Sequence, residues 1–148
     1  MIRVGILGLG EGRSTLSAVL NSKKLTLVKM CDISEEACRK RAREFDFHAY
    51  TTRYEELLSD PGIDLIAIYT PDHLHADHVL QALRSGKHVA CTKPFIDDLS
   101  RAGELLEAAR ESGKRVFVGQ SSRFFEPARR QRSDYEAGVI GNLITIES

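Results

Sequence analysis

The chain has 148 residues, a length that fits a compact domain able to bury about two thirds of the surface its unfolded form exposes. Lysine plus arginine and aspartate plus glutamate both number 21, so the zero net charge gives no reason to expect nucleic acid or an acidic membrane as a partner. No apolar stretch approaches transmembrane length, and the charged, strand-like start does not resemble a secretion signal. We therefore expect a cytoplasmic protein.

The cysteine pattern agrees with that location. Cys31, Cys38 and Cys91 form neither a C-x-x-C pair nor an even set, and two of them end apolar stretches. We expect buried free thiols, which are typical of a reducing compartment.

A glycine-rich stretch opens the chain, where residues 3–13 read Arg-Val-Gly-Ile-Leu-Gly-Leu-Gly-Glu-Gly-Arg. The apolar residues before Gly8 predict a strand, and the residues from Ser14 onward predict a helix. Because glycine has no Cβ, a phosphate can approach the main chain at such a turn, where the first N–H groups of the helix are unpaired. The stretch therefore predicts a site for the diphosphate of a dinucleotide. The turn residues that we expect to hold it are Gly8, Gly10, Glu11 and Gly12.

The stretch departs from the usual dinucleotide fingerprint at one position. The fingerprint has glycine at positions one, three and six, but counting from Gly8 puts Arg13 at the sixth position and Gly12 one place early. The third glycine normally permits close packing of helix on strand, so either the helix starts differently or Arg13 points outward. An ordinary strand-to-helix turn stays open as the alternative.

Apolar and amphipathic stretches alternate along the chain, which is typical of β-α units around a parallel sheet. Residues 63–69 form the most apolar stretch, which predicts a central strand covered on both faces. The predicted fold is an α/β doubly wound parallel sheet of the Rossmann kind. After the first strand, we expect strands at residues 25–31, 47–51, 63–69, 88–91 and 115–118, and later helices at residues 35–45, 52–60, 72–85, 97–112 and 126–137.

The end of the chain differs in kind. Gly138 and Gly141 predict a turn, and residues 143–147 alternate like a half-exposed strand. Because a strand without a later partner is unusual at a C-terminus, we expect residues 1–120 to form the dinucleotide-binding domain. Residues 121–148 are then a linking helix and the start of a truncated second domain.

Asp32 ends the second predicted strand, 22 residues beyond Gly10. This spacing is close to the roughly 20 residues expected of the acid that binds the adenosine ribose in dinucleotide sites. A carboxylate accepts hydrogen bonds from both ribose hydroxyls and repels a 2′-phosphate, so Asp32 favours NAD over NADP. Capping of the following helix is the alternative role, and the two roles can coexist.

The stretch Thr-Pro-Asp-His-Leu-His at residues 70–75 follows the most apolar strand at its carboxyl end, the edge where open α/β sheets bind ligands. His75 and His78 would be neighbours on a helix, which together with His73 suggests a metal site. No cysteine and few carboxylates accompany them, so we predict no metal. Solvated histidines at the start of a helix are the other alternative.

Residues 91–95, Cys-Thr-Lys-Pro-Phe, close the next predicted strand at the same edge of the sheet. Lys93 therefore faces the predicted cleft, with an extended backbone because proline follows it. Its ammonium could orient a substrate hydroxyl, stabilise an alkoxide or bind the nicotinamide ribose. A surface lysine without a function is the alternative.

Together these motifs resemble the N-terminal domain of the Gfo/Idh/MocA oxidoreductase family, which includes glucose-fructose oxidoreductase and inositol dehydrogenases. Each piece alone is common, but the set covers essentially the whole chain in order. The matching pieces are Gly8-Leu9-Gly10, Cys31-Asp32, residues 70–75, Gly86-Lys87-His88-Val89, Lys93-Pro94, Val118-Gly119-Gln120, Arg123-Phe124 and Pro127.

The resemblance implies a nicotinamide dinucleotide with its adenosine ribose at Asp32 and its nicotinamide half near residues 70–75. It also implies that Lys93 corresponds to the catalytic lysine of the family's Glu-Lys-Pro motif, with Thr92 in place of the glutamate. Arg123 matches an arginine near the cleft. The cofactor-binding residues that we expect are Gly8, Gly10, Glu11, Gly12, Asp32, Thr70, Pro71, His73, His75, Lys93, Pro94 and Arg123.

Family members carry a second, mostly β domain that binds the substrate and supplies an acid-base histidine, and residues 141–148 look like its first strand. The resemblance thus predicts the NAD-binding half of an oxidoreductase acting on a sugar or polyol, homo-oligomeric and inactive as these 148 residues alone. A non-catalytic NAD-binding or sensing module and an enzyme of another dinucleotide class stay open as alternatives.

Overall fold

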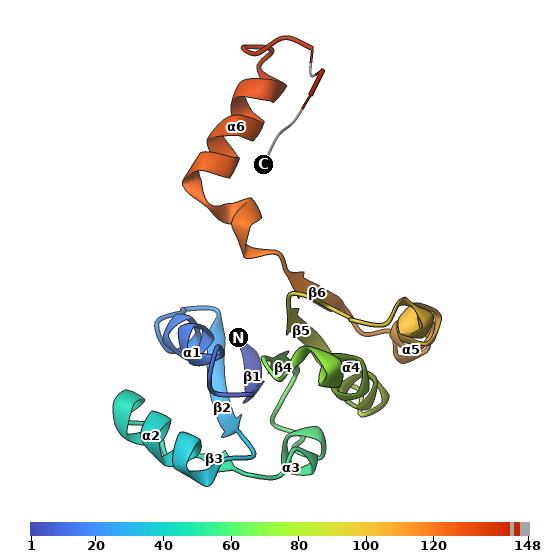
Figure 1. Cartoon of the computed structure of the whole chain (residues 1–148). Helices are drawn as coiled ribbons and strands as arrows, with labels where there is room; N and C mark the ends of the chain where they lie inside the picture. Colours follow the sequence, from blue (N-terminus) through green and yellow to red (C-terminus); the bar gives the residue numbers. More distant parts are fainter. Residues whose placement is uncertain (143, 146–148) are drawn as a thin grey trace.

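The computed structural model describes residues 1–142 and 144–145, and its centre is one sheet of six parallel strands. The strands are β1 (Ile2–Leu7), β2 (Leu25–Cys31), β3 (Tyr50–Thr51), β4 (Leu65–Ile68), β5 (His88–Thr92) and β6 (Val116–Gly119). Their order across the sheet is β3-β2-β1-β4-β5-β6 (Figure 1). This order confirms the predicted doubly wound sheet. Successive strands are added on one side of β1 up to β3 and on its other side from β4 onward, and open α/β sheets bind ligands at such a change of side.

Helices cover both faces of the sheet and divide the core in two. The helices are α1 (Arg13–Leu20), α2 (Glu35–Phe45), α3 (Glu55–Leu58), α4 (His75–Arg84), α5 (Ala102–Ser112) and α6 (Glu126–Glu136), with single turns of 3-10 helix at η1 (Asp72–Leu74), η2 (Leu99–Arg101) and η3 (Ser121–Phe124). Apolar side chains of α1 and α2 build one core against the sheet, and those of α3, α4 and α5 build the other. The fold is thus a three-layer α/β arrangement, as the alternation of apolar and amphipathic stretches predicted.

The central strand β4 is buried, as the apolar stretch at residues 63–69 predicted. Ile66, Ala67 and Ile68 of β4 are at most 2% exposed, and they alternate between the two cores. The three cysteines are free and buried, which confirms their expected burial. Within the described residues, no helix has the length and apolar character needed to cross a bilayer.

Two predicted elements differ from the structure for local reasons. The third strand covers only Tyr50–Thr51, because the Phe47 N–H donates to the Ala42 carbonyl and so finishes the preceding helix. The predicted helix at residues 97–112 begins with η2, and α5 follows only from Ala102. The Asp98 carboxylate caps that first turn by accepting the Ser100 N–H at 2.9 Å.

The last described part of the chain leads away from the sheet. Figure 1 shows α6 beyond β6, and none of its residues is buried. Residues 144–145 are in no strand, and the other residues of the strand predicted at 143–147 lie outside the described residues. The division of the chain at residue 120 therefore stays a prediction.

Candidate dinucleotide-binding site

In the turn between β1 and α1, two glycines lie so close to backbone oxygens that no residue with a Cβ could replace them. Gly8 has a φ of +87°, and a Cβ there would lie 2.4 Å from the Tyr69 carbonyl oxygen. A Cβ on Gly12 would lie 2.2 Å from the Gly8 carbonyl oxygen. Because α1 begins directly after Gly12, this residue packs closely one position earlier than the third glycine of the usual fingerprint.

Gly10 has a different environment, because a Cβ built there meets no atom within 4 Å. No contact within the described chain therefore requires glycine at this exposed position. The open space lies at the start of α1, which has no side-chain cap and no acidic residue in its first turn. The Arg13 N–H donates to the Gly10 carbonyl at 3.3 Å. An uncapped helix start nevertheless offers further N–H groups and the positive end of the helix dipole, which favour an anion, so the turn fits a diphosphate.

Arg13 points away from this turn. Its Nε donates to Glu44 Oε1 of α2 at 2.6 Å, and its guanidinium lies 5.9 Å from the centre of the Phe45 ring. Glu44 also accepts from Arg41 at 2.6 Å, and Arg41 Nε donates to the Leu9 carbonyl at 2.9 Å. The two guanidinium groups lower the pKa of the Glu44 carboxyl. These hydrogen bonds connect the turn to α2, and the Arg13 side chain does not fill the open space at Gly10.

Asp32 is half-buried beside the same turn, directly after β2. Its Oδ2 accepts the Leu9 N–H at 2.8 Å, and its Oδ1 accepts the Ser34 N–H at 2.9 Å. Each carboxylate oxygen keeps a lone pair for another donor, so ribose hydroxyls can bind while the backbone holds the carboxylate in place. The helix cap itself is Ser34, whose hydroxyl accepts the Ala37 N–H at 3.2 Å.

Histidines and a threonine connect the loops after β4 and β5. Thr70 Oγ1 lies 2.9 Å from His78 Nδ1, and the His78 ring meets Tyr54 edge-on at 5.1 Å between ring centres. Burial lowers the pKa of His78. His75 is completely buried, with Nε2 2.8 Å from the Thr70 carbonyl oxygen and Nδ1 2.7 Å from the Pro94 carbonyl oxygen.

These contacts change the place of His75 in the site. The sequence led us to expect a side chain in contact with the cofactor, but the structure buries it completely, with a carbonyl oxygen close to each ring nitrogen. The expected solvated histidine at a helix start is likewise wrong for this residue, because the β5 loop covers it. Within residues 1–142 and 144–145, no group of three or more metal-ligating side chains is close enough to hold a metal ion.

The remaining predicted residues are exposed. Lys93 follows β5, next to β4, and within the described residues no hydrogen bond or ion pair holds its ammonium. Pro71 and His73 are exposed at the end of β4, and Glu11 is exposed in the glycine turn. Arg123 follows the edge strand β6, where it lines a hollow of about 460 Å³ with residues of α6, so the structure does not bring it to the glycine turn.

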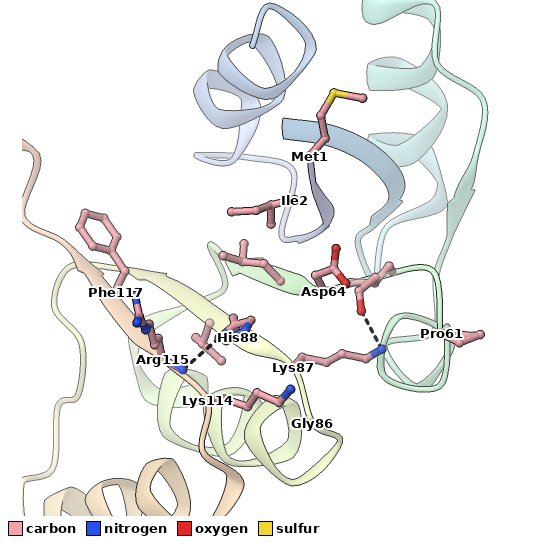
Figure 2. A pocket seen from close by; sticks show the side chains of 13 residues that line it. Met1, Ile2, Pro61, Asp64, Gly86, Lys87, His88, Lys114, Arg115 and Phe117 are labelled. Atoms are coloured by element: carbon pink, nitrogen blue, oxygen red, sulfur yellow. Dashed lines mark hydrogen bonds between the residues drawn. The ribbon is translucent and has the colours of Figure 1, made fainter. Parts of the chain in front are cut away.

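A second hollow of about 770 Å³ lies at the opposite, amino-terminal edge of the sheet (Figure 2). The Lys87 ammonium beside it donates to the Asp60 carbonyl at 2.6 Å and to the Ile63 carbonyl at 2.9 Å. The lysine thus ties a loop to the sheet and contributes to the fold. None of the predicted site residues lines this hollow, and the turn with the open glycine lies at the other edge.

Sequence reasoning missed two supports of the site. The Arg41–Glu44 pair holds the glycine turn, and the Tyr69 hydroxyl pairs with the Thr15 hydroxyl across β4 and α1. Charged residues on an amphipathic helix give no sequence signal for which loop they contact. Tyr69 carried a weak signal, because a tyrosine at the end of an otherwise aliphatic strand needs a partner for its hydroxyl.

The strand order, the open glycine turn and the acid after β2 define a dinucleotide-binding Rossmann domain. The sequence comparison agrees, since residues 2–120 match the family described as an oxidoreductase family with an NAD-binding Rossmann fold. The chain belongs to this Gfo/Idh/MocA family and is its NAD(P)-binding domain.

Individual relatives cover nearly the whole chain. The 1,5-anhydro-D-fructose reductase of Ensifer adhaerens is 32% identical over 145 residues, which are 97% of this chain and 44% of the reductase. The structure of myo-inositol 2-dehydrogenase from Lactobacillus plantarum shares the fold, with a TM-score of 0.89, 23% identity and coverage of 97% of this chain and 43% of its own.

The structure of biliverdin reductase from Synechocystis, in complex with biliverdin and NADP+, has a TM-score of 0.82 and 28% identity over 91% of this chain and 43% of its own. The chain thus spans less than half the length of these relatives.

Proposed function

We propose that this chain is the NAD-binding part of an oxidoreductase that transfers a hydride between nicotinamide and a hydroxyl-bearing carbon of a sugar or polyol. The observation that carries the proposal is the open turn at Gly10, in front of an uncapped helix, with the Asp32 carboxylate beside it. A reductase of 1,5-anhydro-D-fructose among the relatives supports a sugar-like substrate.

The preference for NAD rests on Asp32. Hydrogen bonds from the Leu9 and Ser34 N–H groups fix its carboxylate, and the remaining lone pairs suit the two hydroxyls of an adenosine ribose. A phosphate on the 2′ oxygen would meet this negative charge at close range. The Synechocystis biliverdin reductase complex contains NADP+, so the preference comes from this chain's own residue and not from the fold.

Lys93 is the proposed catalytic residue. Its exposed ammonium follows β5 at the ligand edge, where it would donate a hydrogen bond to the substrate hydroxyl and stabilise negative charge on that oxygen. Nicotinamide, when bound, supplies the hydride acceptor. Thr92 beside Lys93 carries no charge, unlike the glutamate of the family motif. Thr70, Pro71, His73 and Pro94 would line the nicotinamide half, with Arg123 as a further, more distant contact.

We propose that residues 121–148 lead into a second domain that binds the substrate and supplies the acid-base group. The 148 residues alone then bind the cofactor without turnover, because the proton relay lies in that other domain. A homo-oligomer of the complete protein is part of the same proposal.

Calorimetric titration with NAD and NADP tests the cofactor assignment. We expect the wild type to bind NAD more tightly than NADP, and Asp32→Asn to bind NAD about tenfold more weakly, because a hydrogen bond to a charged group is worth about 1.5–3 kcal/mol. Asp46→Asn is the matched control, since Asp46 is exposed at the far end of α2 in a left-handed conformation that asparagine tolerates. Equal affinities for both cofactors in wild type and Asp32→Asn would contradict the assignment.

A second experiment separates an enzyme from a non-catalytic NAD-binding module. In the complete protein, we expect Lys93→Ala to lower kcat by about 10²-fold or more while cofactor affinity changes little. Lys114→Ala, at the opposite edge of the sheet, is the control with unchanged kcat. A protein that binds NAD but forms no NADH with any sugar or polyol would support the module.

A further inference from the structure

The side chain of His75 connects the two loops that end β4 and β5. It is the first residue of α4, and 0% of it is exposed. Nε2 lies 2.8 Å from the carbonyl oxygen of Thr70, and Nδ1 lies 2.7 Å from the carbonyl oxygen of Pro94. One buried ring thus bridges two residues that are 24 positions apart in the sequence and that follow the ends of two neighbouring strands of the sheet.

Both partners of the ring are acceptors. A carbonyl oxygen cannot donate, so hydrogen bonds at both nitrogens require that both carry a proton, whereas a neutral imidazole carries one. A neutral ring would place the lone pairs of a nitrogen and an oxygen against each other at less than 3 Å. A ring that donates to both carbonyls would make both bonds charge-assisted.

The titratable groups within three residues of His75, or next to its partner Pro94, are Asp72 and His73 in η1, Asp77 and His78 in α4, and Lys93 after β5. Burial lowers the pKa of His78, which disfavours a positive charge on this second histidine. Its Nδ1 is paired with the Thr70 hydroxyl, so Thr70 is held by one histidine through its side chain and by the other through its carbonyl.

We propose that His75 is a positioning residue that fixes Thr70 and Lys93 relative to each other by donating to the carbonyls of Thr70 and Pro94. The proposal rests on the proposed function, because these two loops form the nicotinamide half of the site. Lys93 is exposed, and within the described residues nothing holds its ammonium, so the location of its backbone depends on Pro94 directly after it. Loss of the His75 bridge frees that segment without touching the glycine turn.

The first test does not depend on cofactor binding. Nitrogen NMR of the chain labelled with ¹⁵N-histidine, with His75 assigned by its absence in His75→Gln, reports the protonation of both ring nitrogens. At neutral pH we expect both nitrogens of His75 to carry protons that exchange slowly with water. An unprotonated nitrogen in His75 would overturn the proposal.

The second test compares NAD with ADP, which shares the adenosine and diphosphate but lacks the nicotinamide riboside. We expect His75→Gln to weaken NAD binding about tenfold and to leave ADP binding within about twofold of the wild type. Leu83→Ala is the control: Leu83 is fully buried on the same helix, so the cavity lowers stability while the NAD-to-ADP affinity ratio stays unchanged.

The outcomes of this second test are distinct. If His75→Gln weakens NAD and ADP by the same factor, His75 is merely structural and the proposal is overturned. If the wild type binds neither ligand, the proposed function fails, and the nitrogen NMR still decides the protonation of His75.

Discussion

Replacing Gly10 by alanine separates ligand binding from stability. A Cβ at Gly10 meets no atom within 4 Å, and the residue has no positive φ, so the substitution introduces no strain. Alanine also restricts the unfolded chain, so we expect the free energy of unfolding to stay the same or to rise by about 0.4–1 kcal/mol. The same methyl group occupies the space where a diphosphate approaches the main chain, so NAD binding should weaken at least about tenfold.

Two other glycine substitutions serve as comparisons for this result. Gly8→Ala requires a left-handed backbone, at a cost of about 1–2 kcal/mol, and also places a Cβ 2.4 Å from the Tyr69 carbonyl oxygen, so this variant should lose stability. Gly103→Ala in α5 meets open space and should raise stability by about 0.5–1 kcal/mol with NAD binding unchanged.

Thermal unfolding followed by circular dichroism measures the stability part, with a shift in Tm of about 2–4 °C for each kcal/mol in a chain of this size. Calorimetric titration with NAD measures the binding part. The reasoning is refuted if Gly10→Ala binds NAD as tightly as the wild type, or if it loses as much stability as Gly8→Ala.

Two further predictions concern titratable groups. The Arg3 guanidinium and N–H donate to the Asp64 carboxylate at 2.7–3.0 Å and hold the pKa of that carboxyl well below its usual range. The Arg3–Asp64 pair therefore stabilises the fold above about pH 4, and this stabilisation is lost as the pH falls further and the carboxylate is protonated. The difference in urea unfolding free energy between wild type and Asp64→Asn should therefore shrink toward low pH, and a constant difference would contradict this. Burial raises the pKa of Cys31 and of Cys91 to about 12, so neither should react with a thiol reagent at pH 8 until the protein unfolds. Rapid labelling of the native protein would show that these thiols are accessible.

The fold could be predicted from sequence because its signals are local. The apolar stretch around β4 and the glycine turn carry their own periodicity and conformational requirements, and Ser34 is a recognisable helix cap. Even the shifted third glycine could be interpreted, since one of the two predicted outcomes for Arg13, an outward side chain, is what the structure shows.

The parts that failed depend on contacts between distant segments. The burial of His75 is decided by the Pro94 carbonyl, 19 residues later, and no local pattern distinguishes it from the exposed His73. Likewise, the partner of Arg41 is the Leu9 carbonyl, 32 residues earlier. Such contacts depend on the order of the strands in the sheet. The sequence predicts the class of fold but not which distant residues that order brings together.

The central claim is that main-chain N–H groups at the Gly10 turn hold a diphosphate while Asp32 binds the neighbouring ribose. A crystal structure of the protein with NAD tests it most directly. We predict the diphosphate in front of the first turn of α1 and the adenosine ribose hydroxyls within hydrogen-bonding distance of the Asp32 carboxylate. An empty turn in crystals saturated with NAD, or NAD bound at the opposite edge of the sheet, would contradict the claim.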